Sequence, residues 1–206
     1  MTRKKANILI AEDDQAVLES LEMVFSTLGY VVRTVTDGLQ AVAALREMVP
    51  DILLSDLNMP GMSGYELLSI VNRRFPGVKS VAMSGAFPVN AIPSGLAADA
   101  FYEKGGGIPN LLRTMETALA AERSAQPSPH IIWMQKIDYE SCSQDSIMIS
   151  CPECFRTFPQ ALRGTPSMIL DAVCTHCGGA IVFAIVPSLE TIFAVPYRTP
   201  PRHRPQ

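Results

Sequence analysis

The chain has 206 residues, of which 48% are hydrophobic and 18% charged, and its formal net charge is −3. This composition supports one large folded domain or two smaller ones, and it excludes a chain that is disordered throughout. The weak negative charge gives no overall electrostatic footprint for nucleic acid. All apolar runs are shorter than the roughly 18 residues that a membrane helix needs. The basic start at 1–5 leads into carboxylates at 12–14 with no secretory apolar stretch between them. We therefore expect a cytoplasmic protein that does not contact membranes.

Strands and helices are predicted to alternate over the first part of the chain. Short apolar runs indicate strands, and apolar residues at helical spacing indicate helices between them. The predicted strands are 7–11, 31–35, 52–56, 78–83 and 99–102, and the predicted helices are 15–28, 38–49, 64–75 and 108–119. Asp14 and Asp37 are candidate N-caps, and Gly29 and Pro50 are candidate stops. In the second predicted helix we assign Leu39, Val42, Leu45 and Val49 to the buried face, and in the last one Ile108, Leu111, Leu112, Met115 and Leu119.

This alternation is typical of an α/β domain built around a parallel sheet. Among doubly wound topologies we choose the flavodoxin-like, five-stranded order for it. Between the fourth and fifth strands, the stretch 87–99 contains Pro88, Pro93 and Gly95. These residues leave room there for no helix longer than about two turns.

Several strands of the predicted sheet end on a polar side chain. Glu12 and Asp13 follow the first strand, Asp56 ends the third, Ser84 follows the fourth and Lys104 follows the fifth. Because the carboxyl ends of parallel strands meet at one edge of a sheet, these groups should converge there. A lone Asp56 is better explained as a loop cap, and the convergence is what favours a functional site.

Clustered carboxylates repel each other unless a cation joins them. Hard oxygen ligands suit Mg²⁺, which retains waters and open positions for phosphate oxygens. We expect Glu12, Asp13 and Asp56 to bind Mg²⁺ together with the backbone carbonyl of Asn58. Asp56 beside the ion is then a candidate nucleophile toward a phosphoryl group. Lys104 and Ser84 are candidates to contact the transferred oxygens.

Residues 6–122 resemble a response-regulator receiver domain of two-component signalling. The resemblance rests on the acidic pair at 12–13, the segment 56–64 (DLNMPGMSG), Ser84 and Lys104. It implies that Asp56 accepts phosphate from a histidine kinase or phosphotransfer protein when Mg²⁺ is present. It further implies a switch in which Ser84 moves toward the phosphate and Phe101 turns inward. Such a protein assists its own phosphotransfer and is not a conventional turnover enzyme.

The sequence departs from the family pattern near the fifth strand. Family members usually carry a proline after the lysine, whereas Lys104 is followed by three glycines, 105–107. We expect these glycines to hold Lys104 less rigidly. Phe101 has no hydroxyl group, and Tyr102, one residue out of register, should point to the opposite side of the sheet.

The second part of the chain begins after a change of composition. We assign 1–122 to the receiver domain, 123–145 to a linker, 146–195 to a small, mostly β, zinc-ribbon-like domain and 196–206 to a disordered tail. The segment 131–134 carries the only tryptophan, Trp133. It is interpreted either as a segment that docks on one of the domains or as an exposed patch for a partner. Strands are predicted at 147–150, 155–158, 180–186 and 191–195.

Two C-x-x-C pairs predict a metal site in this second domain. Cys151 and Cys154 are separated from Cys174 and Cys177 by 19 residues, which is the spacing of a four-cysteine Zn²⁺ site. Gly178 provides the turn after the second pair, and Phe155 occupies the same place after the first. A domain this small needs its metal in order to fold well. His176 is interpreted as a surface residue and Cys142 as a free thiol.

Three functions remain open at this point. The favoured one is a response regulator that signals to an unknown output protein through protein contacts. The first alternative is a transcription factor that binds DNA through the second domain. After residue 122 there are 7 basic and 6 acidic residues, a balance of +1, and four thiolates on Zn²⁺ would add −2. We therefore do not favour nucleic acid as a partner. The second alternative is a pseudo-receiver, a structural module that takes no phosphate.

Overall fold

The computed structural model describes residues 5–85, 98–122, 131–135, 146–162 and 170–186. Its first part alternates strands and helices. The elements are β1 (Asn7–Ala11), α1 (Gln15–Thr27), β2 (Val31–Val35), α2 (Gly38–Glu47), β3 (Ile52–Asp56), α3 (Gly64–Arg74), β4 (Lys79–Ser84), β5 (Ala100–Glu103) and α4 (Ile108–Ala120). No helix in the described ranges has the length and apolar character to span a lipid bilayer.

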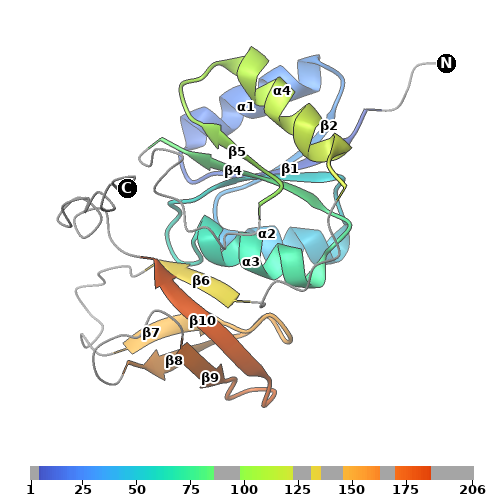
Figure 1. Cartoon of the computed structure of the whole chain (residues 1–206). Coiled ribbons are helices and arrows are strands. Elements are labelled where there is room, and N and C mark those ends of the chain that lie inside the picture. Colours follow the sequence, from blue (N-terminus) through green and yellow to red (C-terminus); the bar gives the residue numbers. More distant parts are fainter. Residues whose placement is uncertain (1–4, 86–97, 123–130, 136–145, 163–169, 187–206) are drawn as a thin grey trace, which may run out of the picture.

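The five strands form one parallel sheet in the order β2-β1-β3-β4-β5. This is the flavodoxin-like order predicted from the sequence. Figure 1 shows the sheet between two helical layers, with α1 and α4 on one face and α2 and α3 on the other. The central strand β3 is buried along its whole length, which explains its unbroken apolar run. Its carboxyl end places Asp56 at the middle of the sheet edge.

Capping residues begin three of the helices, and two of these caps, Asp14 and Asp37, were predicted from the sequence. The carboxylate of Asp14 accepts hydrogen bonds from the backbone N–H groups of Ala16 and Val17 and begins α1. Asp37 accepts one from Gln40 N–H and begins α2, and Ser63 accepts one from Glu66 N–H and begins α3. Each cap satisfies donors that a helix N-terminus otherwise leaves unpaired.

Three apolar residues assigned to buried helix faces are exposed instead: Leu39, Val49 and Leu119. α2 ends at Glu47, before Val49, and its buried face consists of Ala41, Val42, Ala44 and Leu45. The buried stripe therefore lies to one side of Leu39 and includes alanines, which an apolar pattern based on large side chains overlooks. In α4 the buried residues are Leu111, Met115 and Ala118, so the stripe again ends on an alanine.

The connection from β3 to α3 is tight. A Cβ atom on Gly64 would lie 1.9 Å from the backbone oxygen of Asp56, so no other residue fits without moving the strand end. Gly64 N–H donates to Leu57 O, and Leu57, Met59 and Met62 are buried around the turn. α3 is thereby fixed directly to the strand that carries Asp56.

The second part of the chain forms a small module of two sheets. Strands β6 (Ile131–Gln135), β10 (Ala180–Val186) and β9 (Leu170–Val173) form one sheet in that order, with β6 parallel and β9 antiparallel to β10. Strands β7 (Ser146–Ser150) and β8 (Thr157–Ala161) form an antiparallel pair.

Several predictions for this module need correction. The predicted linker 123–145 contains β6, so it is not a linker throughout. The segment around Trp133 docks as a strand, which is the first of its two interpretations. β8 begins two residues later than the predicted strand 155–158, because the first cysteine turn extends through Phe155. The predictions for 87–97, Cys142, the strand 191–195 and the tail 196–206 lie outside the described residues.

The module packs on the outer side of α3 and shares a hydrophobic core with the α2/α3 face of the sheet (Figure 1). That core joins side chains of the first part, such as Leu53, Leu68 and Val71, to side chains of the second, such as Ile132 and Phe183. A second core, around Phe25 and Met115, fills the space between the sheet and the α1/α4 layer. α3 is consequently buried on both sides.

Candidate functional site

Three carboxylates meet at the carboxyl edge of the five-stranded sheet, as the sequence predicted. Glu12 follows β1 and is only 1% exposed, Asp13 beside it is exposed, and Asp56 ends β3 and is buried. One carboxylate oxygen of each lies within 4.8 Å of the other two. The strands β1 and β3 are direct neighbours in the sheet, and this adjacency brings the residues together.

Lys104 supplies the positive charge of this cluster. Its Nζ lies 2.8 Å from Glu12 Oε2 and 3.1 Å from Asp56 Oδ2. Lys104 N–H also donates to Ser84 O at 2.8 Å, which continues the β4–β5 pairing and directs the lysine toward the edge. Two carboxylates that would repel each other are therefore joined by one ammonium group.

Burial and pairing shift the pKa values of both partners. Burial raises the pKa of Glu12 above its ordinary value, and the nearby charge of Asp56 adds to this, although the hydrogen bond from Lys104 opposes it. Burial alone would lower the pKa of Lys104, but its hydrogen bond to Glu12 and the charge of Asp56 outweigh that and raise it. Lys104 is thus held as a cation in this site.

Two further predicted residues flank the cluster. Ser84 is fully buried at the end of β4. Phe101 packs against the α2/α3 core and Tyr102 against the α1/α4 core, so the two aromatic residues lie on opposite faces of the sheet, as predicted. The switch role of Ser84 and Phe101 stays a prediction, as does the ligand role of the Asn58 carbonyl.

The glycine run after Lys104 has a conformational reason. Gly105 has φ 99° and Gly107 has φ 77°, values that side-chain-bearing residues rarely adopt. Gly107 is the N-cap of α4, and its carbonyl accepts a hydrogen bond from the Tyr102 hydroxyl at 3.4 Å. The run is therefore a turn with defined geometry between β5 and α4.

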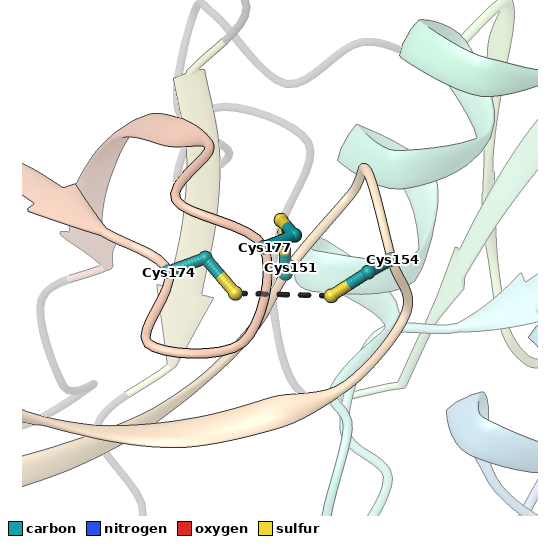
Figure 2. Close-up of side chains that lie close together, drawn as sticks. All are labelled: Cys151, Cys154, Cys174 and Cys177. Carbon is teal, nitrogen blue, oxygen red and sulfur yellow. Dashed lines mark hydrogen bonds between the residues drawn. The ribbon is translucent and has the colours of Figure 1, made fainter.

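The four predicted cysteines also come together. Cys151 and Cys154 come from the turn between β7 and β8, and Cys174 and Cys177 from the turn between β9 and β10. Figure 2 shows the four side chains together, with the sulfur atoms of Cys154 and Cys174 pointing toward each other. The Sγ atoms of Cys151 and Cys177 are 3.7 Å apart, as are those of Cys154 and Cys174. The Sγ atoms of all four lie within 4.8 Å of one another.

The two cysteine turns have the same backbone hydrogen bonds. In the first, Phe155 N–H donates to Cys151 O and Cys151 N–H to Arg156 O; in the second, Gly178 N–H donates to Cys174 O and Cys174 N–H to Gly179 O. His176 N–H donates to the sulfur of Cys174 at 3.4 Å, while its ring lies against Thr157 O, away from the cluster. His176 is exposed, as expected.

Two of the sulfur–sulfur separations can be compared with those around a tetrahedral metal ion. A tetrahedral ion with metal–sulfur distances of ~2.3 Å sets its sulfur atoms ~3.8 Å apart. The observed 3.7 Å matches that edge, whereas a disulfide would bring two sulfur atoms to ~2 Å. Four thiols from two turns thus offer soft donor atoms at one point, with no disulfide between them.

Sequence reasoning missed the polar residues of α3 that contact the second module. Ser150 N–H donates to Glu66 Oε1 at 2.7 Å, and Trp133 N–H donates to Ser69 Oγ at 3.1 Å. Burial raises the pKa of Glu66 to about 7, against the opposing effect of the Ser150 hydrogen bond. A partial signal was present: five of the seven residues in 65–71 are apolar, more than a helix with one broad solvent face usually carries, although Glu66 and Ser69 form a polar strip.

Comparison with known proteins agrees with the geometry of the first part. Residues 8–103 match the family described as "Response regulator receiver domain". The receiver domain protein (CheY-like) from Methanospirillum hungatei JF-1 is 27% identical, with a TM-score of 0.52 over 55% of this chain and 92% of that one. The Vibrio cholerae chemotaxis protein CheY4, at 23% identity and a TM-score of 0.51 over 55% of this chain and 98% of that one, shares the fold.

Curated relatives match part of the chain only. The "DNA-binding transcriptional regulator NtrC" of Salmonella typhimurium is 32% identical over 94 residues, which is 46% of this chain and 20% of NtrC. The "DNA-binding response regulator MtrA" of Mycobacterium bovis is 34% identical over 84 residues, which is 41% of this chain and 36% of MtrA. The match thus spans about a third or less of either relative. Together with the acidic edge and Lys104, these matches show that residues 8–103 have the sequence pattern and the fold of a response regulator receiver domain.

Proposed function

We propose that the chain is a response regulator in which Asp56 accepts a phosphoryl group from a histidine kinase or phosphotransfer protein. The observation that carries the proposal is the placement of Asp56 at the sheet edge. Its Oδ2 is 3.1 Å from Lys104 Nζ, and the carboxylates of Glu12 and Asp13 lie beside it. Neither a loop cap nor a structural ion pair requires three carboxylates and an ammonium group at one point.

The reaction needs a nucleophile and stabilisation of the transferred charge. A carboxylate oxygen of Asp56 forms a bond to phosphorus as the P–N bond of the donor phosphohistidine breaks. The electron pair of that bond stays on the imidazole nitrogen, which takes a proton from solvent, and Asp56 becomes an acyl phosphate. Lys104 is placed to pair with the phosphoryl oxygens, and the Ser84 hydroxyl is the candidate hydrogen-bond donor.

Receiver domains bind Mg²⁺ at acidic residues, and the corresponding cluster here is Glu12, Asp13 and Asp56. Their oxygen atoms are the hard donors that Mg²⁺ prefers, and we infer that the backbone carbonyl of Asn58 completes the protein ligands. When bound, the ion offsets the negative charge that carboxylates and phosphate bring together. Glu12 and Asp13 therefore act by holding the ion and Asp56 by accepting the phosphate.

For the second module we propose a structural Zn²⁺ site and a role in protein contacts. The support is the four-cysteine donor set with sulfur atoms 3.7 Å apart in two equivalent turns. Metal analysis of freshly purified protein tests it, with about one zinc per chain expected. Less than about half an equivalent would contradict the assignment.

Phosphorylation is tested with a small-molecule phosphodonor and Mg²⁺, read by intact mass. We expect a species heavier by about 80 Da, lost on treatment with hydroxylamine because an acyl phosphate is cleaved by it. Asp56→Asn should abolish this species. Asp51→Asn is the matched control, since Asp51 precedes the opposite end of the same strand and its carboxylate accepts hydrogen bonds from Asn7. If no such species forms, the chain is a pseudo-receiver, the alternative in which this part is purely structural.

A second candidate function is DNA-binding transcriptional regulation, favoured by the names of the relatives NtrC and MtrA. Against it stands the near-neutral charge of the second part, with 7 basic and 6 acidic residues after residue 122. Binding of fluorescent duplex DNA at low salt decides between the two. Binding that weakens steeply with added salt would favour this candidate, and a flat titration would exclude it.

A further inference from the structure

The first cysteine turn, residues 151–156, lies directly against the carboxyl end of α3. Glu153, between the two cysteines, forms ion pairs with two arginines of the helix. Its Oε1 is 2.5 Å from Arg73 and its Oε2 is 2.7 Å from Arg74. Glu153 is thus a link between the cysteine cluster and the receiver domain, because the turn that positions Cys151 and Cys154 also positions this carboxylate.

Phe155 makes a second contact from the same turn. Its ring stacks on Phe75 at the end of α3, with centroids 6.3 Å apart and planes inclined by 24°. The guanidinium groups of Arg46, from α2, and Arg74 each lie 5.7 Å from the ring centroid. Arginines at this distance from an aromatic face are attracted to it. The ring therefore joins the turn to two helices of the receiver.

The backbone conformation of Phe155 indicates that the turn itself does not require an aromatic residue at this position. Phe155 has φ 59°, and the equivalent residue of the second turn is Gly178 with φ 73°. A non-glycine residue in this conformation is strained by about 1–3 kcal/mol, and a glycine is not. The turn that faces solvent has the unstrained residue, and the turn that faces the receiver has an aromatic residue despite the strain.

Contacts continue along one side of α3 toward its beginning. Glu66, Ser69 and Arg73 are spaced i, i+3 and i+7, so they share one helix face. They contact Ser150, Trp133 and Glu153, respectively. Ser150 directly precedes the buried ligand candidate Cys151. The same helix face thus supports both the entry to the first cysteine turn and the turn itself.

We propose that metal binding at the four cysteines and docking of the second module on α3 are thermodynamically linked. Arg73, Arg74 and Phe75 are then positioning residues for the metal site, although they belong to the receiver. The metal fixes the turn that presents Glu153 and Phe155, and their contacts with α3 in turn hold Cys151 and Cys154 in place. Linkage is reciprocal, so whatever loosens docking weakens metal binding by the same factor. This inference rests on the proposed zinc site.

The first test measures zinc affinity of the full chain by competition with a chromophoric chelator. Arg73→Gln combined with Arg74→Gln removes both partners of Glu153 without touching the second module. We expect zinc to bind on the order of tenfold more weakly. Arg113→Gln, an exposed arginine on α4, is the matched control and should bind like the wild type. Equal affinities of the double variant and the wild type would overturn the linkage.

The second test uses Phe155→Gly, which gives the first turn the residue found in the second. If only the local turn mattered, relief of strain would leave zinc affinity unchanged or increase it. Linkage predicts weaker zinc binding, because the ring no longer contacts Phe75. Trp133 is the only tryptophan and lies at the interface, so its emission reports docking independently. We expect chelation to shift this emission in the wild type.

The outcomes separate the two proposals. A wild-type chain that takes up no zinc would overturn the metal site and the linkage together. A chain that takes up zinc with the same affinity in every variant, or whose Trp133 emission ignores chelation, would overturn the linkage alone and leave the metal site standing.

Discussion

The acidic cluster of the receiver and the cysteine cluster of the second module are two proposed metal sites, and they are built in opposite ways. The acidic residues stand at the ends of strands in a five-stranded sheet, and Lys104 already neutralises part of their charge. The cysteines stand in two turns between short strands. The first arrangement is supported by a core on each side of its sheet, whereas the second relies on a small module and on α3.

This difference predicts unequal dependence on metal. A site whose charges are paired and whose strands are covered on both faces keeps its geometry without the ion. A site whose ligands are thiols in two turns gains much of its order from the ion, since binding and folding are coupled in small metal domains. We therefore expect the first site to keep its geometry without Mg²⁺ and to need the ion only for phosphotransfer. We expect the second site to need zinc for its structure.

Removing zinc should have the largest effect on the molecule. A strong chelator should abolish amide protection in β7–β10, because structural zinc contributes on the order of 10 kcal/mol to folding in small domains. Strands β1, β3 and β4 should keep their protection. Hydrogen exchange read by mass spectrometry, with and without chelator, measures both. A chelator that leaves β7–β10 protected would show that the two clusters do not differ in this way.

A buried carboxylate between the two regions should make their packing pH-dependent. Burial raises the pKa of Glu66 from 4.5 to about 7 in the folded chain. Between these values the folded state holds more protons on this group than the unfolded state, so its contribution to stability falls as pH rises through the window. Glu66→Gln keeps an oxygen for Ser150 N–H and cannot ionise. Its free energy of unfolding, relative to that of the wild type, should rise by about 2.5 kcal/mol between pH 5 and pH 8.

Urea unfolding at saturating zinc measures this difference in the free energy of unfolding. Any effect of cysteine ionisation cancels in the comparison, because the variant and the wild type have the same cysteines. Glu116→Gln, an exposed carboxylate on α4, serves as the control and should show no such trend. A constant difference between Glu66→Gln and the wild type across this range would mean that Glu66 is not held in a pH-sensitive contact with the second module.

The smallest expected effect tests whether Lys104 balances the acidic cluster. Lys104→Met keeps the apolar stem and removes the ammonium group that faces Glu12 and Asp56. The lysine side chain is 26% exposed, so we expect a loss of about 2 kcal/mol, less than for a fully buried pair. Millimolar Mg²⁺ should restore most of it, since the ion supplies the missing charge.

Lys79→Met is the matched control for this variant. Lys79 pairs with Asp99 at 3.5 Å, away from the acidic cluster. Mg²⁺ should therefore not restore the stability that Lys79→Met loses. Thermal unfolding of both variants with and without the ion gives the comparison. If Mg²⁺ restores neither variant or both equally, Lys104 is not the group that balances these carboxylates.

Residues whose role is local or follows from strand order could be predicted from the sequence. Asp14 and Asp37 cap the helices that follow them, and the meeting of Glu12, Asp56 and Lys104 follows from the carboxyl ends of parallel strands. Four cysteines at the spacing of a metal site come together because two short turns bring each pair into place. In these cases the order of residues along the chain is enough to predict which side chains come together.

The remaining features depend on packing between distant segments. β6 is apolar but has only five residues and follows a polar, proline-containing stretch, so its sequence does not indicate that it pairs with β10. β9 alternates buried and exposed residues over only four positions, too few for a period to be recognised. The contact of Glu66 with Ser150 spans 84 residues, and nothing near either position in the sequence indicates the other.

The burial of α3 on both sides has a consequence for evolution and for handling the protein in pieces. Residues Gly64–Val71 are buried without interruption, which a helix with one solvent face does not show. A fragment cut after residue 122 would uncover this helix and present a new apolar surface, with self-association as the expected result. In this chain α3 packs against the sheet on one side and against the second module on the other, so substitutions on α3 are constrained by two surroundings at once.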